Sequence, residues 1–97
     1  MILMHAPTLR EFARKHPICK QQLNDWEYFI KQTPLENPND IKTHFPPVKI
    51  LKNNRFVFKI KGNEFRLIAK INFQQQICDV RFVGTHSEYD KINADVI

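Results

Sequence analysis

The sequence predicts an α+β fold, in which two N-terminal helices pack on one face of a twisted antiparallel sheet and a short helix follows near the C-terminus. Three features indicate this arrangement. Apolar residues recur at helical spacing in residues 9–32, alternating β-rich runs fill residues 55–83, and Thr85–Glu88 has the spacing of a capping box. With 97 residues, 42% of them hydrophobic, the chain can form a single core, so we expect one domain spanning residues 1–97.

The first helix is expected to follow a short edge strand at Met1–Met4. Thr8–Glu11 has T-x-x-E spacing, in which the two side chains satisfy free N–H groups at the start of a helix. The helix should therefore begin at Leu9 and continue to His16, because Pro17 disfavours helical geometry in the residue before it.

The second helix is expected at Lys20–Gln32. Leu23, Trp26 and Ile30 recur on one stripe of it, and such a stripe most often packs on a sheet. We therefore expect Trp26 to be a core residue and not a ligand-binding one.

Residues 33–47 hold four of the six prolines and should be mostly connection. Asn37-Pro38 has the pattern of an N-cap followed by proline at the first helical position, so Asn39–His44 is expected to form a short helical turn. A short strand at Val48–Leu51 and a turn at Lys52–Asn54 should then lead the chain into the sheet.

A β-hairpin is predicted at Arg55–Lys61 and Glu64–Phe73, because two alternating runs flank Gly62 and Asn63, which tolerate the positive φ of a tight turn. The register imposed by a two-residue turn closes the apolar face without a misfit. That face then holds Phe56, Phe58, Ile60, Phe65, Leu67 and Ala69.

The opposite face of the hairpin carries two pairs of like charges. The same register sets Lys59 opposite Arg66 and Arg55 opposite Lys70. Like charges directly opposed cost about 0.2–1 kcal/mol per pair, so two such pairs on one face indicate that an anion binds there.

A third strand is expected at Ile77–Val83, with Cys78, Val80 and Phe82 on the apolar face. On the charged face this register lays Asp79 opposite Lys70 and Arg81 beside Ile68. The turn before the strand should fall within Phe73–Gln76.

Gly84 is expected to break the third strand, and the capping box at Thr85–Glu88 should start a helix at His86. In that helix His86, Tyr89 and Asp90 are i, i+3 and i+4 and share one face. A free histidine titrates near pH 6.5 and suits proton transfer, although a histidine at a helix start is more often structural than catalytic.

The composition narrows the class of protein. Fifteen Lys and Arg against ten Asp and Glu give a net charge of +5, which favours a nucleic acid or an acidic protein as partner. The two cysteines, Cys19 and Cys78, indicate neither a disulfide framework nor a zinc site, and neither a phosphate-binding glycine loop nor a metal-ligand spacing occurs. We expect no cofactor and no metal.

Without a signal peptide or an apolar run of membrane length, a soluble cytoplasmic protein with no membrane partner is expected.

These residues leave three functions open. An enzyme that uses proton transfer would need the basic face together with the face of His86, Tyr89 and Asp90. A non-catalytic RNA- or DNA-binding module would need only the basic face, and a protein-interaction domain would need only an acidic partner.

Two runs of the chain closely resemble the HigB toxins of bacterial type II toxin–antitoxin systems, which belong to the RelE-like superfamily. They are Arg55-Phe-Val-Phe-Lys-Ile-Lys-Gly-Asn-Glu-Phe-Arg-Leu-Ile68 and Val80-Arg-Phe-Val-Gly-Thr-His-Ser-Glu-Tyr-Asp-Lys-Ile92. The resemblance extends over nearly the whole chain, including Lys-His-Pro at 15–17 and Asp-Ile-Lys…Phe-Pro within 40–46.

The resemblance implies a small RelE-like fold and a metal-independent, ribosome-dependent mRNA endonuclease, or mRNA interferase, that inhibits translation. It implies a HigA-type antitoxin with a helix-turn-helix as the neutralising partner, the ribosome and mRNA as further partners, and contact with operator DNA only through the antitoxin. The chemistry would be attack of a ribose 2′-hydroxyl on the adjacent phosphate.

By resemblance, four residues are candidates for catalysis. Arg66 matches the sheet arginine that contacts the scissile phosphate, Lys59 a neighbouring strand lysine, and Tyr89 the tyrosine of the last helix. His86 falls near an arginine of RelE, which leaves open which group is the acid and which the base. The expected substrate-binding residues are Arg55, Lys61, Lys70, Arg81 and Asp90.

Overall fold

The computed structural model describes residues 1–62 and 64–97; Asn63, one of the two predicted turn residues, lies outside the described residues. Its elements in chain order are β1 (Ile2–Met4), α1 (Pro7–Lys15), a 3-10 turn (Pro17–Cys19), α2 (Lys20–Gln32), α3 (Pro38–His44), β2 (Lys49–Ile50), β3 (Arg55–Ile60), β4 (Phe65–Asn72), β5 (Ile77–Thr85) and α4 (His86–Asp90). This order confirms the predicted α+β class.

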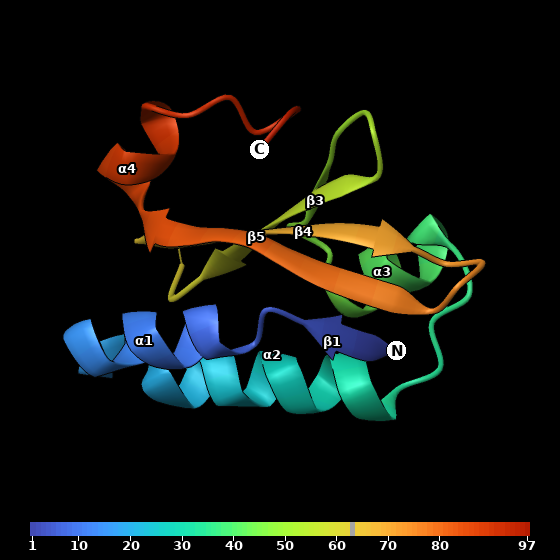
Figure 1. Cartoon of the computed structure of the whole chain (residues 1–97), viewed down its shortest axis with the longest axis horizontal. Coiled ribbons are helices and arrows are strands. Elements are labelled where there is room, and N and C mark those ends of the chain that lie inside the picture. Colours follow the sequence, from blue (N-terminus) through green and yellow to red (C-terminus); the bar gives the residue numbers. More distant parts are fainter. Residues whose placement is uncertain (63) are drawn as a thin grey trace.

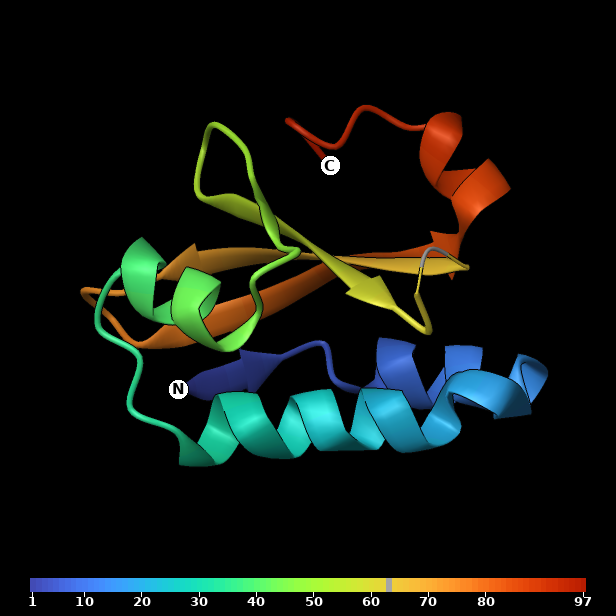
Figure 2. The same cartoon turned by 180° about the vertical axis from the view of Figure 1, so that it is seen from behind.

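The described chain forms three layers. Helices α1 and α2 lie side by side under a five-stranded sheet of order β1-β5-β4-β3-β2, and α4 with the C-terminal segment lies above it (Figure 1). Among the strands of the described residues, only β1, which pairs with β5, is parallel to its neighbour. Helix α3 sits at the β2–β3 side of the sheet (Figure 2). The lower face of the sheet therefore meets the helices, and we call the upper face the outer face.

Helix α1 begins two residues earlier than predicted, and the capping box expected at Thr8 and Glu11 is absent from it. Ala6 is the N-cap, with no side-chain cap, and Pro7 occupies the first turn. Proline has its φ fixed near the helical value and needs no N–H partner there, so Pro7 can start the helix and leaves Thr8 inside it. The second helix matches the prediction, and so does α3, where the Asn37 side chain accepts from the Asp40 N–H at 3.0 Å.

The predicted hairpin register is confirmed at every described pair. Phe58 pairs with Leu67, Lys59 with Arg66 and Arg55 with Lys70. Phe58 and Leu67 are 1% and 0% exposed, so they lie in the core as expected. Strand β2 covers only two of the four residues predicted for it.

Strand β5 departs from its predicted register at a β-bulge opposite Ile68 and Ala69. Arg81 is the extra residue, so Phe82 pairs with Ile68 and Val83 pairs with Leu67. The placement of Phe82 on the apolar face and of Arg81 beside Ile68 was therefore wrong. The bulge lets Val83 pack against the core in place of Phe82.

Gly84 does not break the strand, which continues to Thr85. A Cβ atom at Gly84 would lie 2.5 Å from Cζ of Phe82, so the ring of Phe82 rests against this residue. Gly84 is therefore a residue that leaves space for an aromatic side chain inside a strand.

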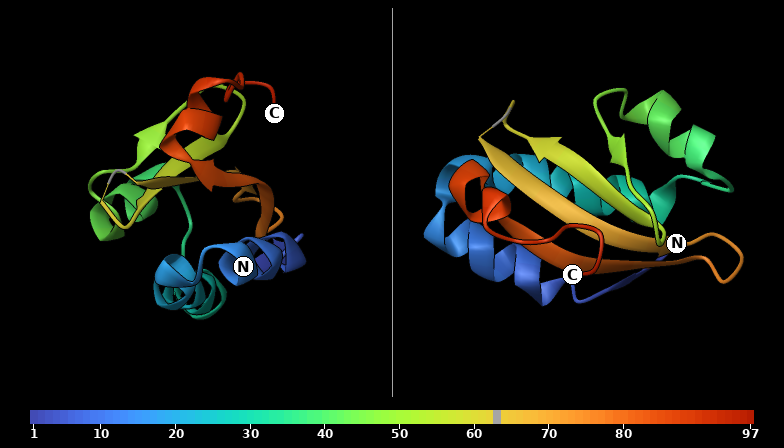
Figure 3. Two further views of the ribbon diagram at one scale, coloured as in Figure 1. Left: turned by 90° about the vertical axis from the view of Figure 1, so that its left-hand side faces the viewer. Right: turned by 90° about the horizontal axis from the view of Figure 1, so that it is seen from above.

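The core fills the space between the helices and the lower face of the sheet. The predicted stripe Leu23, Trp26 and Ile30 is buried there, with exposures of 0–3%. Val57 and Ile68 are also buried although the register places them on the outer face. The segment after α4 returns over that face and covers part of it (Figure 3).

Candidate active site

Arg66 lies on the central strand β4 and has its side chain on the outer face, opposite Lys59 of β3. Only 7% of Arg66 is exposed. Its guanidinium carbon lies 5.6 Å from the centroid of the Tyr89 ring, within the range of a cation–π interaction. The structure thus brings together Arg66, Lys59 and Tyr89, which the sequence assigns to the site from two distant segments.

Helix α4 is positioned by its own start. The capping box predicted at Thr85 and Glu88 is present, with the Thr85 side chain accepting from the Glu88 N–H and the Glu88 carboxylate accepting from the Thr85 N–H at 2.8 Å. The His86 N–H also donates to the Glu64 carbonyl at 3.0 Å, which ties α4 to the start of β4. The hydrogen bond from Thr85 lowers the pKa of Glu88 below its ordinary value.

His86 and Asp90 form an i, i+4 pair on α4, with His86 Nε2 3.3 Å from Asp90 Oδ2. Both side chains are more than half exposed, at 53% and 60%. The Asp90 carboxylate is therefore close enough to orient the imidazole ring of His86. Solvent keeps this interaction weak in the free protein.

Arg55 and Arg81 form a second basic group, toward the opposite end of the outer face. Both donate to the main-chain oxygen of Ile97, from Arg55 Nη2 at 2.8 Å and from Arg81 Nε at 3.2 Å. Arg55 also donates to the Asn53 carbonyl and is 8% exposed. These two predicted substrate-binding residues therefore hold the C-terminal segment in this structure.

The carboxylate of Asp79 neutralises part of this second group. It bonds to Arg81 Nη1 at 3.1 Å and to His5 Nδ1. Burial opposes its ionisation, but the hydrogen bonds from His5 and Arg81 outweigh burial and lower the pKa of Asp79. Lys70 pairs with Asp79 across the strands and remains exposed, whereas Lys61 lies at the end of β3 and is half-buried.

Two features near the site were missed from the sequence. The ring of Phe82 is on the outer face beside Gly84, which pairs directly with Arg66. The segment 91–97 covers the second basic group. Nothing in the alternation of residues signals the bulge that turns Phe82 outward, although a glycine within a strand is an indication of a bulge or a close approach.

This arrangement suits an anion that bears a planar group. A guanidinium held under an aromatic ring presents its fork in a fixed direction, and a fork can donate two hydrogen bonds to one phosphate. Lys59 adds a mobile positive charge beside it.

Among residues 1–62 and 64–97, no group of three or more His, Cys, Asp or Glu side chains is placed to hold a metal ion. No helix in these residues has the length and apolar character needed to cross a membrane.

The chain is similar to known proteins over nearly its whole length. A protein-family model described as "HigB_toxin, RelE-like toxic component of a toxin-antitoxin system" matches residues 19–92. The "mRNA interferase HigB" of Escherichia coli O6:H1 is 36% identical over 93 residues, which are 94% of this chain and 89% of that protein. The "mRNA interferase toxin HigB" of Escherichia coli K12 is 33% identical over 97% of this chain and 92% of its own, and the "mRNA interferase HigB" of Shigella flexneri gives the same values. The chain belongs to the HigB family of RelE-like toxins of toxin–antitoxin systems.

Proposed function

We propose that this toxin is an mRNA interferase, an endoribonuclease that cleaves messenger RNA during translation on the ribosome and is neutralised by a HigA-type antitoxin. The observation that carries the proposal is the position of Arg66, which is buried under Tyr89 on a cationic sheet face. Relatives that bear the name mRNA interferase support it.

The proposed reaction is attack of a ribose 2′-hydroxyl on the adjacent phosphate, without a metal. Negative charge grows on the phosphate oxygens during this attack, and preorganised donors aimed at those oxygens lower the barrier. Arg66 would hold the phosphate with its fork, and Lys59 would stabilise the added charge.

The reaction also needs a base for the 2′-hydroxyl and an acid for the leaving 5′-oxygen. His86 and Tyr89 are the candidates, and both lie on α4. Asp90 would orient His86, while the Tyr89 ring would stack on a base next to the cleaved bond. Lys61, Lys70, Arg55 and Arg81 would bind further phosphates, the last two only where the segment 91–97 leaves them accessible.

The proposal is tested with purified protein in a reconstituted translation system, with cleavage of a translated message mapped by primer extension. Wild type should cleave, Arg66→Ala should lose about 10²–10³ in rate, and Arg66→Lys should recover only part of it because lysine lacks the fork. Melting temperatures recorded in parallel establish that the variants are folded.

Each result separates the functions that remain open. Cleavage at the wild-type rate by folded Arg66→Ala would refute this active site. RNA binding without cleavage by wild type would favour a non-catalytic binding module. Cleavage of free RNA at the same rate as translated RNA would contradict the ribosome dependence alone, and growth arrest that persists when a HigA-type antitoxin is co-expressed would contradict that partner.

A further inference from the structure

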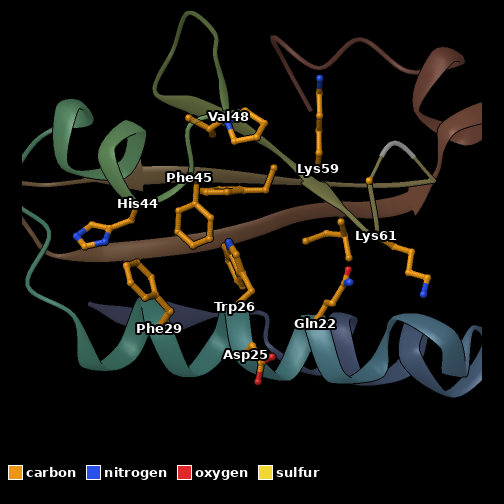
Figure 4. A pocket seen from close by; sticks show the side chains of 13 residues that line it. Gln22, Asp25, Trp26, Phe29, His44, Phe45, Val48, Lys59 and Lys61 are labelled. Atoms are coloured by element: carbon orange, nitrogen blue, oxygen red, sulfur yellow. The ribbon is translucent and has the colours of Figure 1, made fainter.

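A groove of about 470 Å³ lies beside β3, and its lining includes Lys59 of the candidate site but neither Arg66 nor Tyr89. Its floor is aromatic, and α2, β3 and the segment after α3 supply its walls (Figure 4). Lys59 stands at its upper rim, Lys61 at one end, and Gln22 and Asp25 at its lower rim (Figure 4). The floor is formed by Trp26, Phe29, Phe45 and Phe58.

Among the described residues, the edge of β3 that faces away from β4 has no strand partner along this groove. The β2–β3 ladder contains Lys49 with Val57 and Ile50 with Phe56, and the same register would next bring Pro47 opposite Lys59. Proline has no N–H to donate, so the ladder ends there. The main-chain carbonyl of Arg55 accepts from the Leu51 N–H on this edge. Because alternate residues of a strand direct their main-chain groups to the same edge, the N–H and C=O of Lys59 also point there.

Trp26 adds a side-chain hydrogen-bond donor to the main-chain donor of Lys59. Its side chain rises from α2 into the groove with the ring nitrogen at the upper end, near Phe45 (Figure 4). The residue is 3% exposed, and within the described chain its Nε1–H is a buried side-chain donor that has no acceptor. A buried donor without an acceptor costs about 1–3 kcal/mol, which a ligand with an acceptor can remove once the rings around Nε1 part to admit it.

The ring geometry of the floor favours a peptide over a nucleobase. Phe58 meets Trp26 edge-to-face at 71° and Phe45 at 82°. Trp26 and Phe58 are also 3% and 1% exposed, so they offer no open ring face on which a base could stack. The unpaired edge of β3, in contrast, is a template for another extended chain.

We propose that this groove and the adjoining edge of β3 are a docking site for an extended segment of a partner protein in which acidic and apolar residues alternate. The segment would pair with the main chain of Lys59 as an added strand. Strand alternation would then send its apolar side chains into the groove, where one of its oxygens accepts from Trp26, and its acidic side chains toward Lys59 on the outer face. In a toxin of this family the antitoxin is the partner in which to seek the segment, and only that step rests on the proposed function.

The test uses the purified full chain and the peptide acetyl-Glu-Leu-Glu-Leu-Glu-amide as probe. Trp26 is the only tryptophan of the chain, so its fluorescence reports directly on the groove. Binding should shift its emission and move the backbone amide resonances of Lys59 and Lys61. A backbone N-methylated copy of the peptide, which cannot form the added ladder, should not bind, and a copy with Lys in place of Glu should bind more weakly.

Two variants locate the contact by calorimetry. Trp26→Phe removes the donor and keeps most of the ring, so affinity should fall roughly three- to tenfold, the worth of one hydrogen bond. Asp25→Lys removes the acidic group of the lower rim and should tighten binding a few-fold. Tyr28→Phe, on the same helix at a side chain that is 70% exposed and outside the groove, is the control and should change nothing.

The proposal fails if no peptide shifts the emission of Trp26, or if the N-methylated copy binds as well as its parent. It also fails if a tetranucleotide of single-stranded RNA quenches Trp26 while the acidic peptide does not, since the groove would then take a base. None of these measurements depends on RNA cleavage, so their failure is distinct from a failure of the proposed function.

Discussion

Tyr89 is placed to contribute in two ways at the residue scale, through its ring and through its hydroxyl. The ring covers the Arg66 guanidinium at 5.6 Å, which helps to hold the fork in position. The hydroxyl is a candidate for proton transfer. Tyr89→Phe keeps the ring and removes the hydroxyl, so we expect cleavage to fall by about 10²-fold or more with an unchanged melting temperature.

Tyr89→Leu, which also removes the ring, is the matched comparison and should lose more activity. If Tyr89→Phe cleaves at the wild-type rate, the ring acts by stacking alone and His86 becomes the remaining candidate for proton transfer. Rates come from primer extension on a translated message.

Single residues also show where prediction from the sequence ends. The assignment of Arg66 and Lys59 to one face followed from the two-residue period of a strand, which admits no other outcome once the turn is known. The outward turn of Phe82 depends on one extra residue at Arg81, and a bulge leaves no trace in that period. Gly84 was interpreted as a strand break because the local sequence contains no information on the ring that rests against it.

Among the elements, α4 carries the candidate acid and base and depends on its capping box more than on packing. It has five residues, none of them buried. Thr85→Ala should therefore cost about 0.5–2 kcal/mol of local stability and release α4 from the sheet. Increased hydrogen exchange at Glu88 and Tyr89 N–H would show this, with Ser87→Ala as a control that leaves the box intact.

The cap also gives α4 a pH dependence. The hydrogen bond with Thr85 lowers the pKa of Glu88 below its ordinary value of 4.5, so its contribution is complete above that value and is lost as pH falls through the lowered one. The α4 amide hydrogens of Glu88→Gln should thus exchange faster than those of wild type at neutral pH and at the same rate in acid. A difference that persists in acid would mean that the carboxylate charge is not what matters.

The element boundaries show which sequence signals are reliable. The T-x-x-E pattern at Thr85 forms its cap, whereas the same pattern at Thr8 does not, because Pro7 starts α1 first. Asn37, the cap of α3, was predicted correctly because a proline follows it and no competing start precedes it. A capping pattern is therefore informative only when no stronger start lies within a turn of it.

At the scale of the whole molecule, the outer face is divided between the candidate site and the C-terminal segment. Asn53 and Arg55 hold that segment from β3 and the turn before it, through Asp95 and Ile97 main-chain oxygens. Its position could not be predicted, because the alternation of Ile92, Ala94 and Val96 is too short to specify a partner. Only the fold shows that Val57 and Ile68 need a cover.

Arg55 consequently has two possible partners, an RNA phosphate as predicted from the sequence and the segment 91–97 as found in the structure. The two assignments predict different salt dependence of RNA binding, since each lysine or arginine that neutralises a phosphate of a single strand adds about 0.7 to the slope of log K against log salt. Because Lys59 is exposed, Lys59→Met should make this slope less steep by the contribution of one residue.

Arg55→Met should instead lower the melting temperature and leave the slope nearly intact, because its donors are already bound to main-chain oxygens. The measurement is filter binding of single-stranded RNA across a range of salt, with calorimetric melting of both variants. A slope that falls as far for Arg55→Met as for Lys59→Met would mean that RNA displaces the segment 91–97 and binds Arg55 in its place. The free protein would then bind RNA fully only after that segment moves.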